Sequence, residues 1–386
     1  MITENTLICS KIAIFVSVNF NMRVNQIDPS QYNQLLTNKV EDTLKYFSGL
    51  ALPQASVIES IPQNYRLRAE FRVWHQDEDS YYIMFDPETK EKYRVDYYLP
   101  GSELVNKLMQ AVRDAFLANP ILRFKLFQVD FLTTLSGEAL VSLIYHKPLD
   151  EEWIEQAKQL KQHLNAIAKV ELIGRARKTK LLIDQDYVVE QFQVNDKQLS
   201  YKQIENSFTQ PNGYINQKML EWAANISQGL NGDLLELYCG NGNFSLGLAH
   251  AFDRVLATEI SRSSVKAAQY NIELNSINNV VIGQSSAEDF AAAYFEGKSV
   301  KSLKEIDLAE YQFSSILVDP PRAGLDEDTE QLVSKFDNIL YISCNPETLA
   351  KNLQHICKTH DVKDISFFDQ FPYTHHIETG VWLVKR

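Results

Sequence analysis

The chain has 386 residues, a formal net charge of −12, and 45% apolar against 23% charged residues. This length exceeds one ordinary core, so we expect a soluble globular protein of two domains. The four cysteines, Cys9, Cys239, Cys344 and Cys357, lack Cys-x-x-Cys spacing, which argues against a zinc ribbon, an iron–sulfur cluster or a disulfide framework. A reducing cytoplasm fits this cysteine usage. The acidic total is evidence against a nucleic-acid partner, although it averages over the whole surface.

An apolar run lies near the start of the chain, at residues 12–20, and it is too short for a membrane span of about 20 residues. Lys11 precedes this run as in a signal peptide, but no small-residue cleavage site follows. We therefore favour an over-extended start, in which residues 1–21 form a leader and Met22 is the alternative to Met1 as first residue.

Residues 22–197 predict an α+β domain. A helix capped by Asp28 is expected over 29–50, because apolar residues recur there at helical spacing. After it the patterns predict strands at 66–74, 80–85 and 92–98, a helix at 102–117, strands at 122–132 and 138–146, a helix from Asp150, and strands around 170–184. Strands grouped in hairpins indicate a largely antiparallel sheet. The domain boundary is expected between Val194 and Lys202.

Two basic stretches stand out in this acidic chain. Strict alternation over 66–74 puts Leu67 and its apolar neighbours toward a core, and places Arg66, Arg68 and Arg72 on the opposite face. The stretch RARKTK gathers Arg175, Arg177, Lys178 and Lys180. From these segments alone, a face that binds RNA and an ordinary solvated strand face are equally good interpretations.

Residues 198–386 alternate strand and helix singly, which predicts a doubly wound parallel sheet with helices on both faces. After a helix at 213–228, strands are expected at 234–237, 255–259, 279–283, 314–321 and 339–344, with helices between them, and near 363–368 and 380–384. Ligands of such sheets bind outside the carboxyl ends of the strands. Polar residues at these ends are therefore the candidates for a site.

The first of these strands ends in a turn that contains Gly240 and Gly242. Two glycines allow a ligand to approach the backbone, whereas the missing third glycine disfavours pyrophosphate. Glu259 ends the next strand, where a carboxylate can accept hydrogen bonds from both ribose hydroxyls. The combination favours an adenosine cofactor over a structural turn beside a solvated glutamate. Cys239 in the turn is expected to be a packing residue.

Three more residues belong to the same edge. Asp319 opens Asp-Pro-Pro, which either lines a cofactor site or merely stops the strand. Cys344 ends a buried strand, and its placement favours a reactive thiol over inert packing. Glu378 precedes the final strand and is either a site residue or a solvated carboxylate. No metal site is expected, because His375 and His376 lack a spaced third ligand.

Together, DLLELYCGNGNFSL, LVDPPRAGL, ISCNPETL, FDQFPYTHHIETG and SFTQPN resemble the RNA uracil-C5 methyltransferase family, most closely its tRNA branch, from about Asp28 to the C-terminus. The resemblance implies a Rossmann-like class I methyltransferase domain that uses S-adenosylmethionine (AdoMet) and an N-terminal RNA-binding domain. It further implies Cys344 as nucleophile and Glu378 as proton acceptor. Beside Gly240, the implied AdoMet contacts are Gln210, Tyr238, Asn243, Glu259 and Asp319.

The substrate implied by this resemblance is uridine 54 in the T-loop of tRNA, extruded into the pocket, with tRNA-like RNA such as tmRNA as a further partner. We expect a monomer whose RNA contacts include Arg66, Arg68, Arg72, Arg175 and Lys178. The ribosomal-RNA branch carries a cysteine-ligated iron–sulfur cluster in its N-terminal half, where this chain has only Cys9. That branch, and a non-catalytic RNA-binding or RNA-folding protein, are the alternatives.

Overall fold

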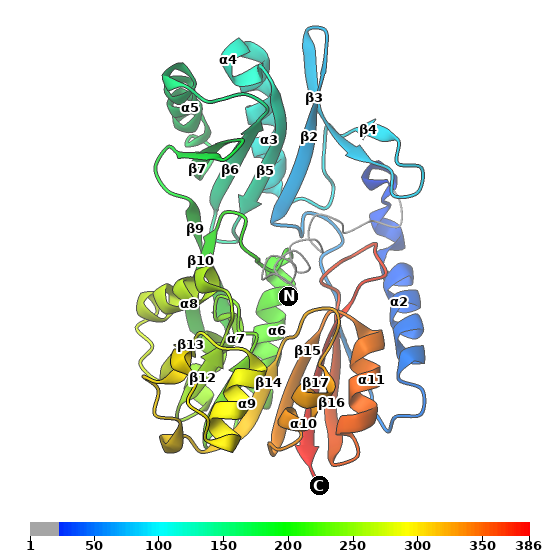
Figure 1. Ribbon diagram of the computed structural model, residues 1–386. Helices are drawn as coiled ribbons and strands as arrows, with labels where there is room; N and C mark the ends of the chain where they lie inside the picture. The colour runs from blue at the N-terminus through cyan, green and yellow to red at the C-terminus, as the bar shows by residue number, and fades with distance from the viewer. Residues whose placement is uncertain (1–22) are drawn as a thin grey trace.

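The computed structural model describes residues 23–386, so the leader, both candidate start residues and Cys9 lie outside the described residues. Two sheets form two lobes, the N-terminal one above the C-terminal one in Figure 1. The predicted class, an α/β protein with a doubly wound C-terminal domain and a largely antiparallel N-terminal sheet, is confirmed.

The C-terminal sheet has eight strands in the order β1-β16-β17-β15-β14-β11-β12-β13. Apart from β17, which runs antiparallel between β15 and β16, neighbouring strands are parallel. The strand order reverses between β11 and β14, which makes their carboxyl ends a topological switch point. The bounds are β1 (Ser56–Ile58), β11 (Asp233–Leu237), β12 (Val255–Thr258), β13 (Val280–Gly283), β14 (Phe313–Val318), β15 (Asn338–Ser343), β16 (His360–Phe368) and β17 (Glu378–Lys385).

Helices cover both faces of this sheet, as the fully buried strands β11 and β12 require. One apolar core lies under α6 (Gly213–Ile226), α7 (Asn243–Leu248) and α8 (Arg262–Leu274). The other lies under α9 (Ala287–Glu296), α10 (Glu327–Val333) and α11 (Pro346–Ile356). Short 3-10 helices also occur in the described residues, at Val24–Gln26, Pro29–Gln31, Ala249–Ala251, Lys301–Leu303 and Leu308–Glu310.

The N-terminal sheet has seven strands in the order β4-β3-β2-β5-β6-β7-β8. They are β2 (Arg68–Gln76), β3 (Asp79–Phe85), β4 (Lys92–Arg94), β5 (Leu126–Thr133), β6 (Glu138–Tyr145), β7 (Lys169–Ala176) and β8 (Thr179–Leu182). The helices α3 (Glu103–Ala118), α4 (Pro120–Arg123) and α5 (Glu151–Leu164) accompany the sheet, and side chains of all three belong to its apolar core. The predicted strand 122–132 starts late, because Asn119 caps α4 and Pro120 opens it.

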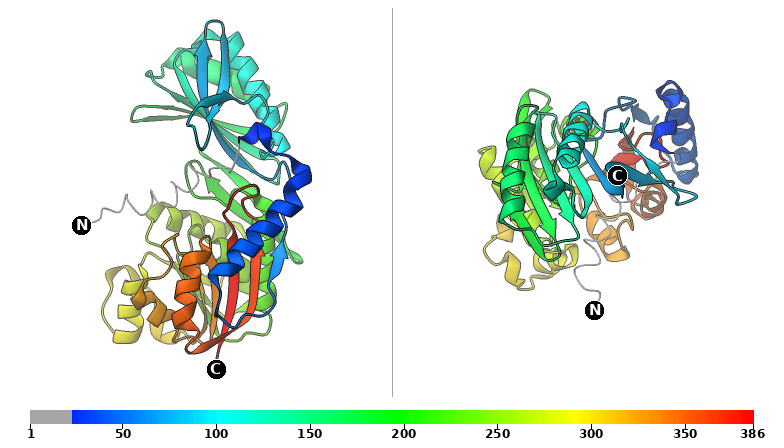
Figure 2. Two further views of the ribbon diagram at one scale, coloured as in Figure 1. Left: turned by 90° about the vertical axis from the view of Figure 1, so that its right-hand side faces the viewer. Right: turned by 90° about the horizontal axis from the view of Figure 1, so that it is seen from above.

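Residues 32–58 depart from the predicted boundary between the domains. Helix α2 (Tyr32–Tyr46) lies beside α11 on the C-terminal lobe, as Figures 1 and 2 show. Strand β1 then pairs in parallel with β16, Val57 opposite Phe367, at the edge of the C-terminal sheet. This segment, which precedes the N-terminal sheet in sequence, therefore completes the C-terminal lobe.

The hairpin β9 (Tyr187–Val194) and β10 (Lys197–Ile204) spans the predicted boundary at residue 197. Its aromatic side chains Phe192 and Tyr201 are buried in the C-terminal core with α6. Directly opposite Tyr201 in the hairpin, the Glu190 carboxylate accepts a hydrogen bond from the Leu135 amide of the N-terminal domain, at 2.9 Å. The hairpin therefore connects the lobes and belongs wholly to neither.

Candidate active site

The glycine turn lies at the switch point, between β11 and α7. Gly240 (φ +57°) and Gly242 (φ +84°) both have left-handed backbone conformations, which suit glycine. A Cβ on Gly242 would lie 2.7 Å from Leu246, whereas a Cβ on Gly240 would meet nothing within 4 Å. A side chain on Gly242 would therefore strain the backbone and crowd Leu246. The open space at Gly240 leaves the backbone accessible to a ligand.

Glu259 is bound directly to this turn. It follows β12, and its Oε2 accepts a hydrogen bond from the Gly240 amide at 3.1 Å, while Oε1 accepts one from the Ser261 amide at 2.8 Å. A carboxylate has about four acceptor positions, so both oxygens retain the capacity to accept from ribose hydroxyls. The two backbone amides thus hold the predicted ribose acceptor in place.

Tyr238 and Asn243 flank the glycines. Tyr238 adopts a φ of +63°, uncommon for a residue with a side chain, and burial raises the pKa of its phenol to about 12. The Asn243 side chain exchanges hydrogen bonds with Asn216 of α6 at 2.9 and 3.0 Å, and the Asn243 carbonyl accepts one from the Tyr201 hydroxyl. Asn243 is therefore held by α6 and by the hairpin strand β10.

Gln210 reaches this edge from the segment before α6. Its Oε1 accepts a hydrogen bond from the Gln370 Nε2 at 2.6 Å, which leaves the Gln210 amide nitrogen available as a donor. Gln370 is almost fully buried, and its Oε1 has no hydrogen-bond partner among residues 23–386. Sequence reasoning missed Gln370, although it lies within the quoted motif FDQFPYTHHIETG.

Cys344 directly follows β15, and Glu378 is the first residue of the neighbouring strand β17. In the antiparallel pair β15·β17, Ser343 is opposite Thr379, so continuing the register by one residue sets Cys344 opposite Glu378. Cys344 is half-buried, while Glu378 is 5% exposed and also pairs with Phe368 of β16. Asn345 accepts a hydrogen bond from the Glu347 amide as N-cap of α11, and this cap ends the strand directly after the thiol.

Asp319 follows β14, between the ends of β11 and β15, so the predicted shared edge is present. Arg322, which directly follows Asp-Pro-Pro, has its Nη2 3.1 Å from Nδ1 of His376. Burial, with the charges of His375, Arg322 and Lys39, lowers the pKa of His376 to about 4. No group of three His, Cys, Asp or Glu residues within 23–386 is arranged to hold a metal ion.

The predicted stripe of three arginines is corrected by the structure. Arg66 is only 7% exposed because it precedes β2 and bridges the backbones of Gly101 and Asn212, and its Nε donates to the Arg68 carbonyl at 2.9 Å. Arg68 is half-buried and donates to the Ser207 carbonyl at 2.8 Å. Of the three, only Arg72 is exposed.

The second basic stretch divides in the same way. Arg175 makes a two-pronged ion pair with Glu205, whose side chain is 3% exposed, and Lys180 lies 3.3 Å from the same carboxylate. Lys178 is exposed in the turn between β7 and β8, with a φ of +61°. Lys178 and Arg72 are therefore the predicted RNA contacts that face solvent.

An aromatic stack accompanies Arg72. Its guanidinium carbon lies 4.0 Å from the centroid of the Phe127 ring, and Phe127 in turn stacks on His146 at 4.0 Å with an interplanar angle of 25°. Flat groups of this kind, with a cation among them, are suited to unpaired bases. The sequence did not reveal this set, because its members come from three different strand regions.

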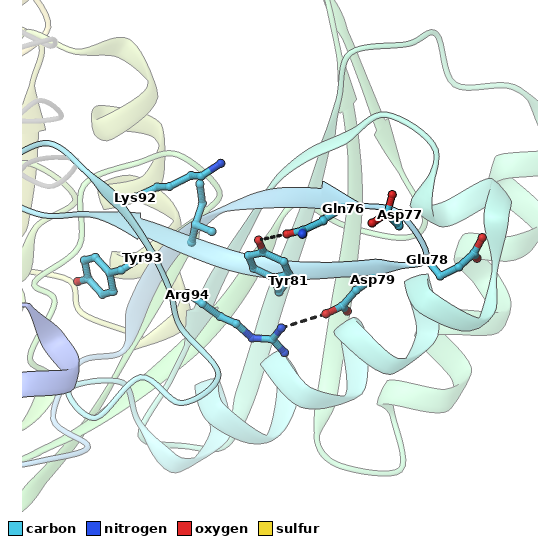
Figure 3. A pocket seen from close by; sticks show the side chains of 9 residues that line it. Gln76, Asp77, Glu78, Asp79, Tyr81, Lys92, Tyr93 and Arg94 are labelled. Carbon is cyan, nitrogen blue, oxygen red and sulfur yellow. Dashed lines mark hydrogen bonds and ion pairs between the residues drawn. The ribbon is translucent and has the colours of Figure 1, made fainter.

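A separate hollow of about 530 Å³ lies on the outer hairpin of the N-terminal sheet. Figure 3 shows its two internal contacts, Tyr81 to Gln76 and Arg94 to Asp79. The hollow is formed by the outer strands β3 and β4 and contains none of the predicted site residues. The strand ends of the C-terminal sheet therefore remain the candidate active site.

Known proteins resemble this chain over nearly its full length. It is 53% identical over 368 residues to the tRNA/tmRNA (uracil-C(5))-methyltransferase of Aliivibrio fischeri (strain MJ11), covering 95% of this chain and 100% of that protein. It is 54% identical over 365 residues to the enzyme of the same name from Shewanella halifaxensis, with the same coverage.

A solved structure shares the fold. The Pyrococcus abyssi tRNA (uracil-54, C5)-methyltransferase, in complex with S-adenosyl-L-homocysteine, superposes with a TM-score of 0.67 at 18% identity, covering 92% of this chain and 83% of that one. None of the helices within 23–386 is long and apolar enough to cross a membrane.

The sequence profile of the tRNA (uracil-5-)-methyltransferase family matches residues 31–386, which include both lobes and every predicted site residue. This match and the curated relatives confirm the resemblance noted from the motifs. The chain belongs to the tRNA (uracil-5-)-methyltransferase family.

Proposed function

We propose that this protein methylates C5 of uridine 54 in the tRNA T-loop with AdoMet as methyl donor. The observation that carries the proposal is the register that sets Cys344 opposite Glu378, at the same sheet edge as Gly240, Glu259 and Asp319. A nucleophile, a base and an adenosine site at one edge are what this reaction needs.

The residues at the switch point fit AdoMet. Glu259 is placed to accept from the ribose, the open backbone at Gly240 permits close approach, and Asp319, Tyr238 and Asn243 line the adjoining strand ends. When bound, AdoMet supplies an electrophilic methyl group. The remaining chemistry belongs to the chain and its RNA.

Cys344 activates the uracil. C5 of uracil is too weakly nucleophilic to accept a methyl group unaided. Attack of the Cys344 thiolate on C6 forms a C6–S bond and pushes the C5=C6 electron pair into an enolate, which makes C5 nucleophilic. The placement of Cys344 at a strand end, half-buried, allows it to reach a base extruded from the T-loop.

Glu378 completes the cycle. After C5 has taken the methyl group it still carries a proton, and the Glu378 carboxylate accepts that proton. The electrons of the C5–H bond restore the C5=C6 double bond, the C6–S bond breaks, and the Cys344 thiolate is regenerated. Its position opposite Cys344 lets both residues act on one ring.

The N-terminal domain holds the RNA in this proposal. Arg72, stacked on Phe127 and His146, offers a cation and flat surfaces to bases of the T-loop, and Lys178 offers a second exposed charge. The relatives' names extend the substrate to tmRNA. We propose a cytoplasmic location, which fits the three described cysteines, none of them in a disulfide, and a monomeric enzyme.

Two variants test the assignment by failing at different steps. Cys344→Ala should abolish transfer of labelled methyl groups to tRNA while AdoMet still binds, because C5 is never activated. In the Glu378→Gln enzyme, Cys344 should still attack the uracil and C5 should still be methylated, but the enzyme should remain covalently attached to the RNA. A denaturation-resistant protein–RNA band should therefore accumulate, and it should disappear in the double variant Cys344→Ala/Glu378→Gln. Normal turnover by Cys344→Ala would refute the mechanism. A freely cycling Glu378→Gln enzyme would refute only the assignment of the base.

A further inference from the structure

Residues 369–377 form the loop that joins β16 to β17 and leads directly into Glu378. Its first residue, Asp369, is 1% exposed, and its amide donates to the Ile58 carbonyl at 3.0 Å. The loop also contains Gln370, which contacts Gln210. A displacement of this loop would therefore move both the proposed base and a proposed cofactor contact.

One buried ammonium group joins the two ends of this loop. Lys39 of α2 donates from Nζ to Asp369 Oδ1 at 2.6 Å, to the Phe371 carbonyl at 2.9 Å and to the His376 carbonyl at 3.1 Å. An ammonium has three donors, and all three are used within the loop. The last contact lies two residues before Glu378. The Lys39 side chain is 7% exposed, so these bonds are shielded from water.

The remaining oxygen of Asp369 is also bound. Tyr32 of α2 donates its hydroxyl to Asp369 Oδ2 at 2.8 Å, and that hydroxyl accepts from the Ser60 amide at 2.7 Å. Ser60 in turn accepts from Asn212, the N-cap of α6, at 2.8 Å. Thus α2, the segment after β1 and the start of α6 converge on one carboxylate.

We propose that Lys39, with Asp369, is a positioning residue that fixes the Glu378 loop for removal of the C5 proton. The inference rests on the proposed role of Glu378. A single charge that ties both ends of a hairpin loop limits how far the loop can open, and misplacement of a base by about 1 Å can cost about 100-fold in rate. Lys39 itself touches neither cofactor nor substrate in this proposal.

The test uses the full chain with tRNA and AdoMet. Lys39→Met should lower turnover by about 100-fold, and it should raise the fraction of enzyme trapped as covalent RNA adduct toward that of Glu378→Gln. Hydrogen exchange of residues 369–378 should accelerate. The control is Lys45→Met, since Lys45 is exposed on the same helix and pairs with Asp42; it should behave as the parent.

Should Lys39→Met fail to fold because Asp369 is left as an unpaired buried charge, the neutral pair Lys39→Met/Asp369→Asn removes that charge and still loses both carbonyl contacts. This double variant should accumulate the covalent RNA adduct and show accelerated hydrogen exchange of residues 369–378, as expected for Lys39→Met. If the double variant has the turnover and the hydrogen exchange of the parent, the proposal is wrong. It is also wrong if turnover is lost while no adduct accumulates and the exchange of the loop does not accelerate. If Glu378→Gln itself leaves no adduct, the base assignment fails, and loop exchange alone decides whether Lys39 fixes the loop.

Discussion

The carboxyl edge of the C-terminal sheet and the outer face of the N-terminal sheet differ in how their charges are used. At the edge, the Glu259 carboxylate is bound by two backbone amides and still has acceptor positions for a ligand. On the N-terminal face, three of the five predicted contacts are already bound within the protein: Arg175 pairs with Glu205, and Arg66 and Arg68 donate to backbone carbonyls. A cluster of charges in the sequence therefore does not by itself indicate groups that are open to a ligand.

The largest effect that sharpens this comparison concerns Glu259. Glu259→Ala should weaken AdoMet binding by roughly 1–3 kcal/mol, about 5- to 150-fold, because the ribose donors and the Gly240 amide lose their acceptor. Glu273→Ala, on the exposed surface of α8, is the control. Calorimetric titration with AdoMet measures both. Equal affinities in parent and Glu259→Ala would show that this carboxylate serves only the turn.

An intermediate effect is expected from the exposed arginine. Arg72→Ala should weaken tRNA binding and reduce the slope of log affinity against log salt by about 0.7–0.9, the value for one phosphate contact. Arg66→Ala should instead lower thermal stability and leave the slope unchanged, because Arg66 is buried. Filter binding across a salt series distinguishes the two. If Arg72→Ala has the same salt slope as the parent, Arg72 is an ordinary solvated residue and not an RNA contact.

The smallest effect comes from Asp130 on the same sheet. It is half-buried opposite Glu70, and burial, then the Glu70 charge, raises the pKa of Asp130 to about 7. The folded chain therefore keeps a proton that the unfolded chain releases between about pH 4 and pH 7, so stability falls as pH rises through that window. Asp130→Asn should raise Tm at pH 8 by about 2 °C and leave Tm at pH 4 nearly unchanged. An equal shift in Tm at pH 4 and pH 8 would contradict the raised pKa of Asp130.

Much of the C-terminal lobe could be predicted because its signals are local. The strands β11, β12, β14 and β15 contain short buried apolar runs, and parallel strands bring their carboxyl ends to one edge. The placement of Cys344 and Glu378 at that edge followed directly. Their catalytic roles stay predictions until the variants are measured.

The features that could not be predicted from the sequence depend on tertiary contacts between distant segments. Alternation placed Arg66 opposite the core, but it says nothing of the Gly101 and Asn212 backbones that bury it. Strand β1 is three residues long with an exposed pattern, so no periodicity reveals it. Gln370 and Lys39 are single polar residues, and their partners are set only by tertiary contacts.

The position of β1 has a consequence for how the protein folds. The strand emerges early in synthesis, whereas its partner β16 lies near the other end of the chain, with Ser56 opposite Ser366. Contacts this distant in sequence close late and slow folding. Until β16 is made, the C-terminal sheet cannot be completed, and a fragment that begins at residue 198 would expose the β16 edge to pairing with other chains. The catalytic lobe is therefore expected to aggregate when expressed alone and to fold when the N-terminal segment is present.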